Sequence, residues 1–83
     1  MRAAELICAP IFADVVSGRV APYAGARRVW SILVQENSEV RNEYLTFEFL
    51  ASEWEDDQMN RDAYDEEIVT EAKRWIEAHA SRF

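Results

Sequence analysis

Apolar residues recur along most of the chain at the three- and four-residue spacing of an α-helix that buries one face. The spacing marks residues 2–17, 22–36, 42–54 and 62–81, and the sequence after Trp54, residues 55–61, is expected to form a polar loop. No stretch shows the strict alternation typical of a strand, and the connections between the segments are short. The pattern predicts an all-α fold, a compact four-helix bundle that forms a single domain over residues 1–83.

Glycine and proline mark the limits of the first two helices. Pro10 either kinks the first helix or lies in the first turn of a helix that begins near Cys8, and we favour the second alternative. Gly18 stands where a left-handed residue would end that helix, Pro22 suits the first position of the next, and Gly25 indicates close approach to another helix. The expected inward stripes are Leu6, Ile7, Ile11, Val15 and Val16 in the first helix, and Tyr23, Ala26, Trp30, Leu33 and Val34 in the second, with Val29 and Ile32 on its flank.

Residues 42–57 are the most aromatic and the most acidic part of the chain. Ser38 or Asn42 is the expected N-cap of this third helix. Leu45 and Phe49 point away from its inward stripe, so they either pack under the first helix or face a partner. The stripe itself comprises Tyr44, Phe47, Leu50, Ala51 and Trp54.

The fourth helix is expected to begin at an N-cap, Asp62, with Asp65 in an approximate capping-box position. It should fray near Ser81. Its inward stripe comprises Ile68, Ala72, Trp75, Ile76 and His79. Because the second, third and fourth helices each carry one tryptophan, we expect Trp30, Trp54 and Trp75 in or beside one core.

The net charge of −7 is unevenly distributed. Residues 1–41 carry +1 and residues 42–83 carry −8, and between Glu43 and Glu71 eleven acids face only Arg61. Such a surface repels nucleic acid and anionic membranes and attracts a basic protein. The plainer alternative is that the acids keep a small domain soluble and monomeric.

Candidate chemistry in the sequence is weak. A calcium-binding EF-hand frame fits poorly, because Arg61 occupies the position that requires glycine, so helix caps and solubilising acids are favoured. Cys8 and His79 lack a third orienting group, and neither Glu48 nor Glu53 has a context that would perturb its pKa. We therefore expect no enzyme activity, metal or cofactor. The EF-hand frame named above consists of Asp56, Gln58, Asn60, Asp62, Tyr64 and Glu67.

The expected location is the cytoplasm. The single cysteine excludes an internal disulfide and indicates a reducing compartment. No run approaches the roughly 18–20 apolar residues of a membrane span, and no targeting segment is evident.

One part of the sequence resembles a known family. It comprises Asn60-Arg61-Asp62, Glu66, Ile68-Val69, Glu71, Lys73, Trp75 and Phe83. This segment is similar to the last helix of the immunity proteins of nuclease bacteriocins. The resemblance implies a small acidic four-helix protein that binds and inhibits a basic toxin nuclease. The paired tyrosines that bind the toxin in that family have no counterpart at residues 50–54, so none of its binding residues is transferred.

The sequence favours a non-enzymatic protein-binding module, an inhibitor, immunity factor or adaptor, that engages a basic protein without nucleic acid or membrane. Acids are expected to steer the encounter, and Phe49 and Tyr64 to set the lifetime of the complex. The alternative is a homo-oligomeric structural protein, for example a homodimer, that buries Leu45 and Phe49 against its own copy. The expected partner-binding residues are Leu45, Glu48, Phe49, Glu55, Asp56, Asp57, Asp62, Tyr64 and Asp65.

Overall fold

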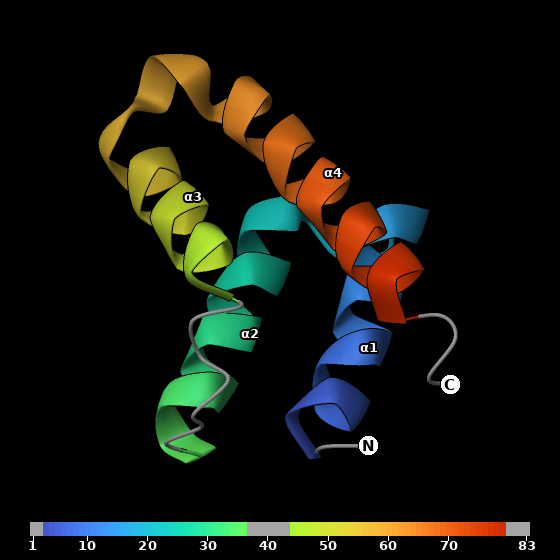
Figure 1. Cartoon of the computed structure of the whole chain (residues 1–83). Helices are drawn as coiled ribbons and strands as arrows, with labels where there is room; N and C mark the ends of the chain where they lie inside the picture. Colours follow the sequence, from blue (N-terminus) through green and yellow to red (C-terminus); the bar gives the residue numbers. More distant parts are fainter. Residues whose placement is uncertain (1–2, 37–43, 80–83) are drawn as a thin grey trace.

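The structure, a computed structural model, describes residues 3–36 and 44–79, without the side chains of residues 3–6 and 33–36. All regular secondary structure in these residues is helical, which confirms the predicted all-α fold (Figure 1). The elements are α1 (Ala3–Ser17), α2 (Pro22–Glu36), α3 (Leu45–Asp56), a short 3₁₀ helix η2 (Gln58–Asn60) and α4 (Arg61–His79). Helices α2 and α4 contact each other, and each packs against both α1 and α3. The result is a four-helix bundle in which η2 forms the corner between α3 and α4.

Helix α1 continues through its proline. It begins at Ala3 and contains Pro10 in its interior, so the expectation of a start near Cys8 was wrong. The physical reason lies in burial: Pro10 is exposed on the outside, whereas Cys8 and Ile11 are buried in the core. An interior proline costs about 3 kcal/mol, and burying each large apolar side chain contributes roughly 1.5–3 kcal/mol. Packing of the inner face therefore outweighs the lost hydrogen bond.

Gly18 ends α1 as predicted, with a φ of 84°. Its amide donates to the carbonyl of Val15 at 3.2 Å, and the Arg19 amide donates to the carbonyl of Asp14 at 2.9 Å. These two bonds form a Schellman motif, which satisfies carbonyls left free at the helix end. The chain then reaches Pro22, the predicted first residue of α2.

Gly25 brings α2 against α1, as predicted. A Cβ atom at this position would lie only 2.3 Å from Cγ2 of Val15. The buried stripe of α2 differs from the predicted one, because Val29, placed on the flank, is fully buried, whereas Tyr23 and Trp30 are half-buried. The close contact at Gly25 rotates α2 so that the side carrying Val29 meets the core. The side chains of Leu33 and Val34 lie outside the described residues.

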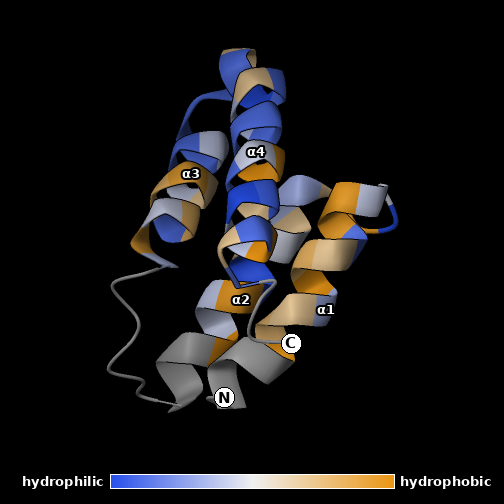
Figure 2. Ribbon diagram, turned by 45° about the vertical axis from the view of Figure 1, so that its right-hand side comes forward, coloured by the Kyte–Doolittle hydropathy of each residue, from blue (hydrophilic) through white to orange (hydrophobic). Residues whose placement is uncertain are grey.

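The core is centred on Phe12, which the predicted stripe of α1 omitted. Its ring lies 4.7 Å from the rings of Phe47 and Trp75 and 6.3 Å from that of Tyr44, measured between centroids. Ile7, which was expected to face inward, is 39% exposed. Because α1 is apolar around most of its circumference (Figure 2), its periodicity does not determine which face is buried.

Helix α4 confirms most of its predicted stripe, since Ile68, Ala72, Trp75 and His79 are all buried. It begins at Arg61, so Asp62 lies in its first turn and the predicted N-cap was wrong. The reason is that η2 ends at residue 60 and α4 begins at the next residue, so no non-helical residue is left at position 62 to act as an N-cap. Helix α3 begins at Leu45 with Tyr44 as its N-cap and no side-chain capping bond, so the expected N-cap at Ser38 or Asn42 was wrong. The expected fraying near Ser81 lies outside the described residues.

Candidate functional site

The side of α3 that faces away from the core carries exposed apolar groups. Leu45 is 43% exposed and Phe49 is 61% exposed, so neither packs under α1. Ser52 and Asp56, both exposed, follow at helical spacing along the same side. We call these four residues the outer face of α3; its first half is apolar and its last residue is acidic.

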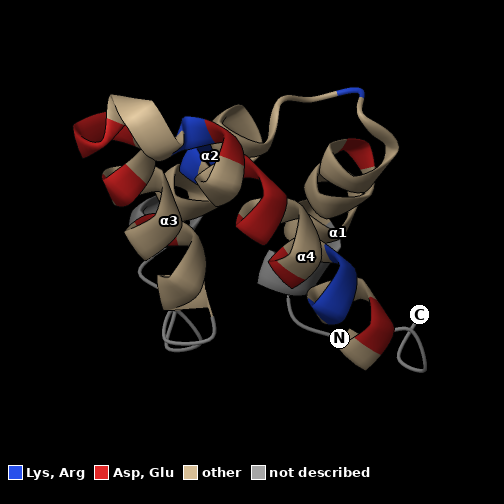
Figure 3. Ribbon diagram, turned by 90° about the horizontal axis from the view of Figure 1, so that it is seen from above, with Lys and Arg blue, Asp and Glu red and all other residues tan. Residues whose placement is uncertain are grey.

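The carboxyl end of α3 carries an unfavourable charge arrangement. Glu53, Glu55 and Asp56 occupy its last turn without a base, and Asp57 follows as the C-cap. Acids near a helix C-terminus are repelled by the negative end of the helix dipole. In Figure 3 acidic positions recur along α3 and α4. A protein that places several acids where they cost stability has a surface typical of a functional site.

Two arginines partly offset this charge. Nη1 of Arg27 lies 3.6 Å from a carboxylate oxygen of Glu55, and both side chains are largely exposed, so this pair contributes little to stability. Nε of Arg61 donates to the backbone carbonyl of Trp54 at 2.9 Å and so satisfies one free carbonyl at the end of α3. Arg61, the one base in the acidic stretch, is therefore already engaged in the fold.

An aromatic contact secures the same corner of the bundle. The ring of Tyr23 stacks on that of Trp54 at 3.9 Å with an interplanar angle of 10°. The guanidinium carbon of Arg61 lies 3.9 Å from the Trp54 ring centroid, a favourable cation–π distance. Two effects raise the pKa of Tyr23: burial is the larger, and a hydrogen bond with Glu55 adds to it. Of the three tryptophans expected in or beside one core, Trp75 is buried in it, whereas Trp30 and Trp54 are half-buried, and Trp54 stacks on Tyr23, which packs against the core.

Asp57 and Tyr64 are brought together inside the turn. A carboxylate oxygen of Asp57 accepts hydrogen bonds from Nδ2 of Asn60 at 2.8 Å and from the Tyr64 hydroxyl at 3.0 Å. The bond from Asn60 and then that from Tyr64 lower the pKa of Asp57, and the bond to Asp57 raises the pKa of Tyr64. These two expected partner-binding residues therefore hold η2 in place.

The remaining expected site residues do not form one surface with the outer face of α3. Glu48 is half-buried on α3, and Asp62 is exposed at the start of α4. Asp65 is half-buried and lines a shallow hollow of about 500 Å³ together with Pro22 and Lys73. Three of the nine residues, Leu45, Phe49 and Asp56, therefore lie on the outer face of α3, two, Asp57 and Tyr64, bond to each other at the turn, and Asp65 lies beside the start of α2. The other three, Glu48, Glu55 and Asp62, belong to none of these groups.

Sequence reasoning missed Met59, which lies in η2 and is 94% exposed. A methionine on a protruding turn is an adaptable apolar contact for another molecule. The sequence around Met59 could have indicated this exposure. Met59 stands between polar neighbours in a stretch without helical periodicity, so no neighbouring apolar residue covers it.

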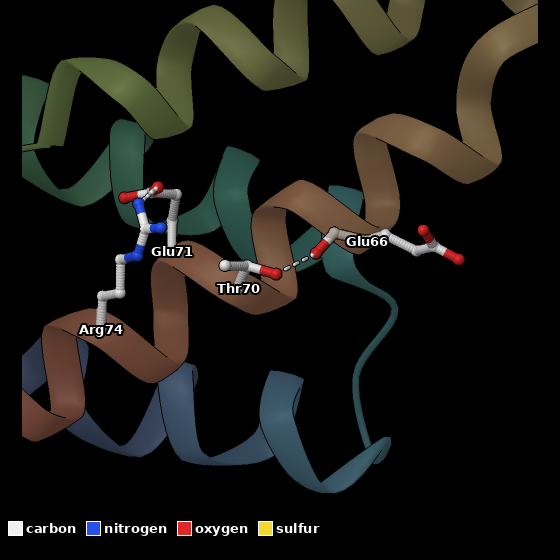
Figure 4. Close-up of polar contacts among 4 residues, drawn as sticks. All are labelled: Glu66, Thr70, Glu71 and Arg74. Atoms are coloured by element: carbon white, nitrogen blue, oxygen red, sulfur yellow. Dashed lines mark hydrogen bonds and ion pairs between the residues drawn. The ribbon is translucent and has the colours of Figure 1, made fainter.

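A shallow groove runs between α3 and α4. Two adjoining hollows of about 370 and 270 Å³ share Thr46, Glu71 and Arg74 as lining residues. Glu71 and Arg74 pair with each other at 2.8 Å (Figure 4), and the Thr70 hydroxyl donates to the carbonyl of Glu66 at 3.0 Å. The charges of Glu71 and Arg74, which line both hollows, are therefore already paired with each other.

The groups considered for chemistry have structural roles. Cys8 is buried in the core. Nδ1 of His79 donates to the carbonyl of Trp75 at 2.7 Å, and the two rings stack at 4.1 Å. The EF-hand frame, which the sequence already disfavours, is taken up by the end of α3, η2 and the first turns of α4 rather than by an open loop. Within residues 3–36 and 44–79, no three acidic, histidine or cysteine side chains are placed to share a metal ion. The helices of this described part are also too short or too polar to cross a membrane.

Comparison with known proteins gives no relative: no protein-family model, curated protein or solved structure matches the chain. The functional argument therefore depends on the geometry of the outer face of α3 and on the charge around it.

Proposed function

We propose that this protein is a non-enzymatic binding module that engages a basic protein through the outer face of α3, as an inhibitor, immunity factor or adaptor. The observation that carries the proposal is the exposure of Phe49, at 61%, beside Leu45 on a helix whose opposite side is core. Burying a side chain of this size contributes about 1.5–3 kcal/mol. Aromatic residues are typical anchors of protein interfaces.

The surrounding charge supports a basic partner. Residues 42–83 carry a net charge of −8, and the last turn of α3 contains no base to balance its acids. A basic protein would relieve the repulsion at the end of α3 and would be steered toward it at long range. The resemblance of the last helix to nuclease-bacteriocin immunity proteins agrees with such a partner.

A homodimer through the same face is less favourable. Two copies of α3 aligned in parallel would bring their acidic ends together, and an antiparallel pair that overlaps over residues 45–56 would set Leu45 of one copy against Asp56 of the other. Burying an unpaired carboxylate in this way is costly. A second copy of the chain is therefore a weaker match to this face than a surface that combines apolar and basic groups.

The proposal can be tested by capture from the source cell at low salt, with bound proteins identified by mass spectrometry. The wild type should retain a basic protein that Phe49→Ala and Asp56→Lys lose. Ile7→Ala and Glu77→Lys are matched controls, because both positions are exposed and lie on α1 and α4. Sedimentation of the protein alone should show a monomer. Equal capture by all variants, or a salt-insensitive dimer, would contradict the proposal.

A further inference from the structure

We propose, on the basis of the function proposed above, that the partner presents an amphipathic helix to the outer face of α3. Its apolar side chains cover Leu45 and Phe49, and a lysine or arginine on the same side pairs with Asp56. The occupant is thereby defined by its secondary structure and by the order of its apolar and basic groups.

A helix is the element that fits this face. Leu45 and Phe49 lie four residues apart, a rise of about 6 Å, and form the type of ridge that enters the groove of a second helix. Residues 45–56 are helical, so they offer no strand edge to which an extended segment of a partner could be added. Helices α2 and α4 already pack against α3, and the outer face is the side they leave open.

Asp56 is the acid that specifies the partner. It is exposed on the outer face, whereas Asp57 is bonded to Asn60 and Tyr64, and Glu55 is paired with Arg27. Asp56 follows Phe49 by seven residues, a rise of about 10 Å along the helix. The partner helix must therefore carry its base about two turns from the side chains that cover Phe49. Charge complementarity at this spacing distinguishes it from a general polycation.

The inference can be tested with synthetic peptides of about 18 residues, long enough to form a helix. The matched peptide carries leucines in one half and lysines in the other half, all on one side of the helix. A second peptide of identical composition has its lysines on the opposite side, and a third has lysines without leucines. Binding to ¹⁵N-labelled protein is followed by amide chemical shifts and titration.

The matched peptide should bind about tenfold or more tightly than either other peptide, with shifts concentrated on residues 45–56. Phe49→Ala and Asp56→Asn should each weaken it by about fivefold or more, whereas Glu77→Gln should change affinity by less than about twofold. Circular dichroism of each variant verifies that the fold is retained.

The other outcomes separate this inference from the proposed function. If the peptide with lysines and no leucines binds residues 45–56 as tightly as the matched peptide, the proposed amphipathic helix is wrong. The proposal of a basic partner would still stand. Shifts concentrated on α1 or α4 would overturn the choice of face. If no peptide shifts residues 45–56 even at millimolar concentration, both the inference and the proposed function fail.

Discussion

Replacing Gly25 with alanine tests the closest contact between α1 and α2. The new Cβ would lie 2.3 Å from Cγ2 of Val15, whereas carbon atoms in ordinary contact are about 3.5–4.0 Å apart. One of the helices must therefore move by about 1 Å, because the β-branched side chain of Val15 has little rotational freedom. Overpacking of this kind costs about 1–3 kcal/mol, against a gain of up to about 1 kcal/mol in helix propensity.

We therefore expect Gly25→Ala to destabilise the wild type by about 1–2 kcal/mol. In a Val15→Ala background the obstructing methyl is absent, and the nearest remaining atoms, at 3.8 Å, are at ordinary contact distance. There Gly25→Ala should stabilise the protein by up to about 1 kcal/mol, so the double-mutant cycle should give a coupling of roughly 2 kcal/mol.

Urea unfolding of the four proteins, followed by circular dichroism, measures these differences. The reasoning would be refuted if Gly25→Ala were more stable than the wild type. It would also be refuted if the substitution had the same cost in both backgrounds, since the cost would then not arise from Val15.

Two further predictions concern the core and the corner. Trp75→Ala should lower the free energy of unfolding by about 3–5 kcal/mol, measured with urea. Trp54→Ala should lower it clearly less, because that ring is half-buried and stacks on Tyr23. Equal costs would contradict the placement of Trp75 in the core and Trp54 at the corner. The pair of Asp57 and Tyr64 should stabilise the fold above pH 3.8 and below pH 10.0, the ordinary pKa values of the two groups. Its contribution should be lost as pH falls through the lowered pKa of Asp57 or rises through the raised pKa of Tyr64. The stability difference between wild type and Tyr64→Phe should therefore shrink at both extremes, and a difference independent of pH would show that the bond is not formed.

The end of α1 and the start of α2 could be predicted because local residues determine them. Gly18 supplies the left-handed residue that ends α1, and Pro22 supplies the fixed φ that begins α2. The buried face of α1 could not be predicted, because apolar residues cover most of its circumference and only the positions of α2 and α4 select Phe12 over Ile7.

The candidate site could likewise be predicted only in part, because the exposure of its residues depends on where the other helices lie. Periodicity placed Leu45 and Phe49 on one side of α3 but could not say whether another helix covers them, because that depends on the position of α1. The corner was missed for a related reason: the stacking of Tyr23 on Trp54 joins residues far apart in the sequence. The bond from Tyr64 to Asp57 likewise spans seven residues of the turn, so no local pattern distinguishes Asp57 from the exposed acid before it.

The rates of binding to the captured basic partner, measured over a range of salt, test the central claim most directly. Association should slow as salt rises, because the screening length falls from about 10 Å at 0.1 M to about 3 Å at 1 M, while dissociation changes less. Phe49→Ala should raise the dissociation rate by more than Asp56→Asn does. Association that ignores salt, or a dissociation rate that Phe49→Ala leaves unchanged, would contradict the assignment of the outer face of α3 as the binding surface.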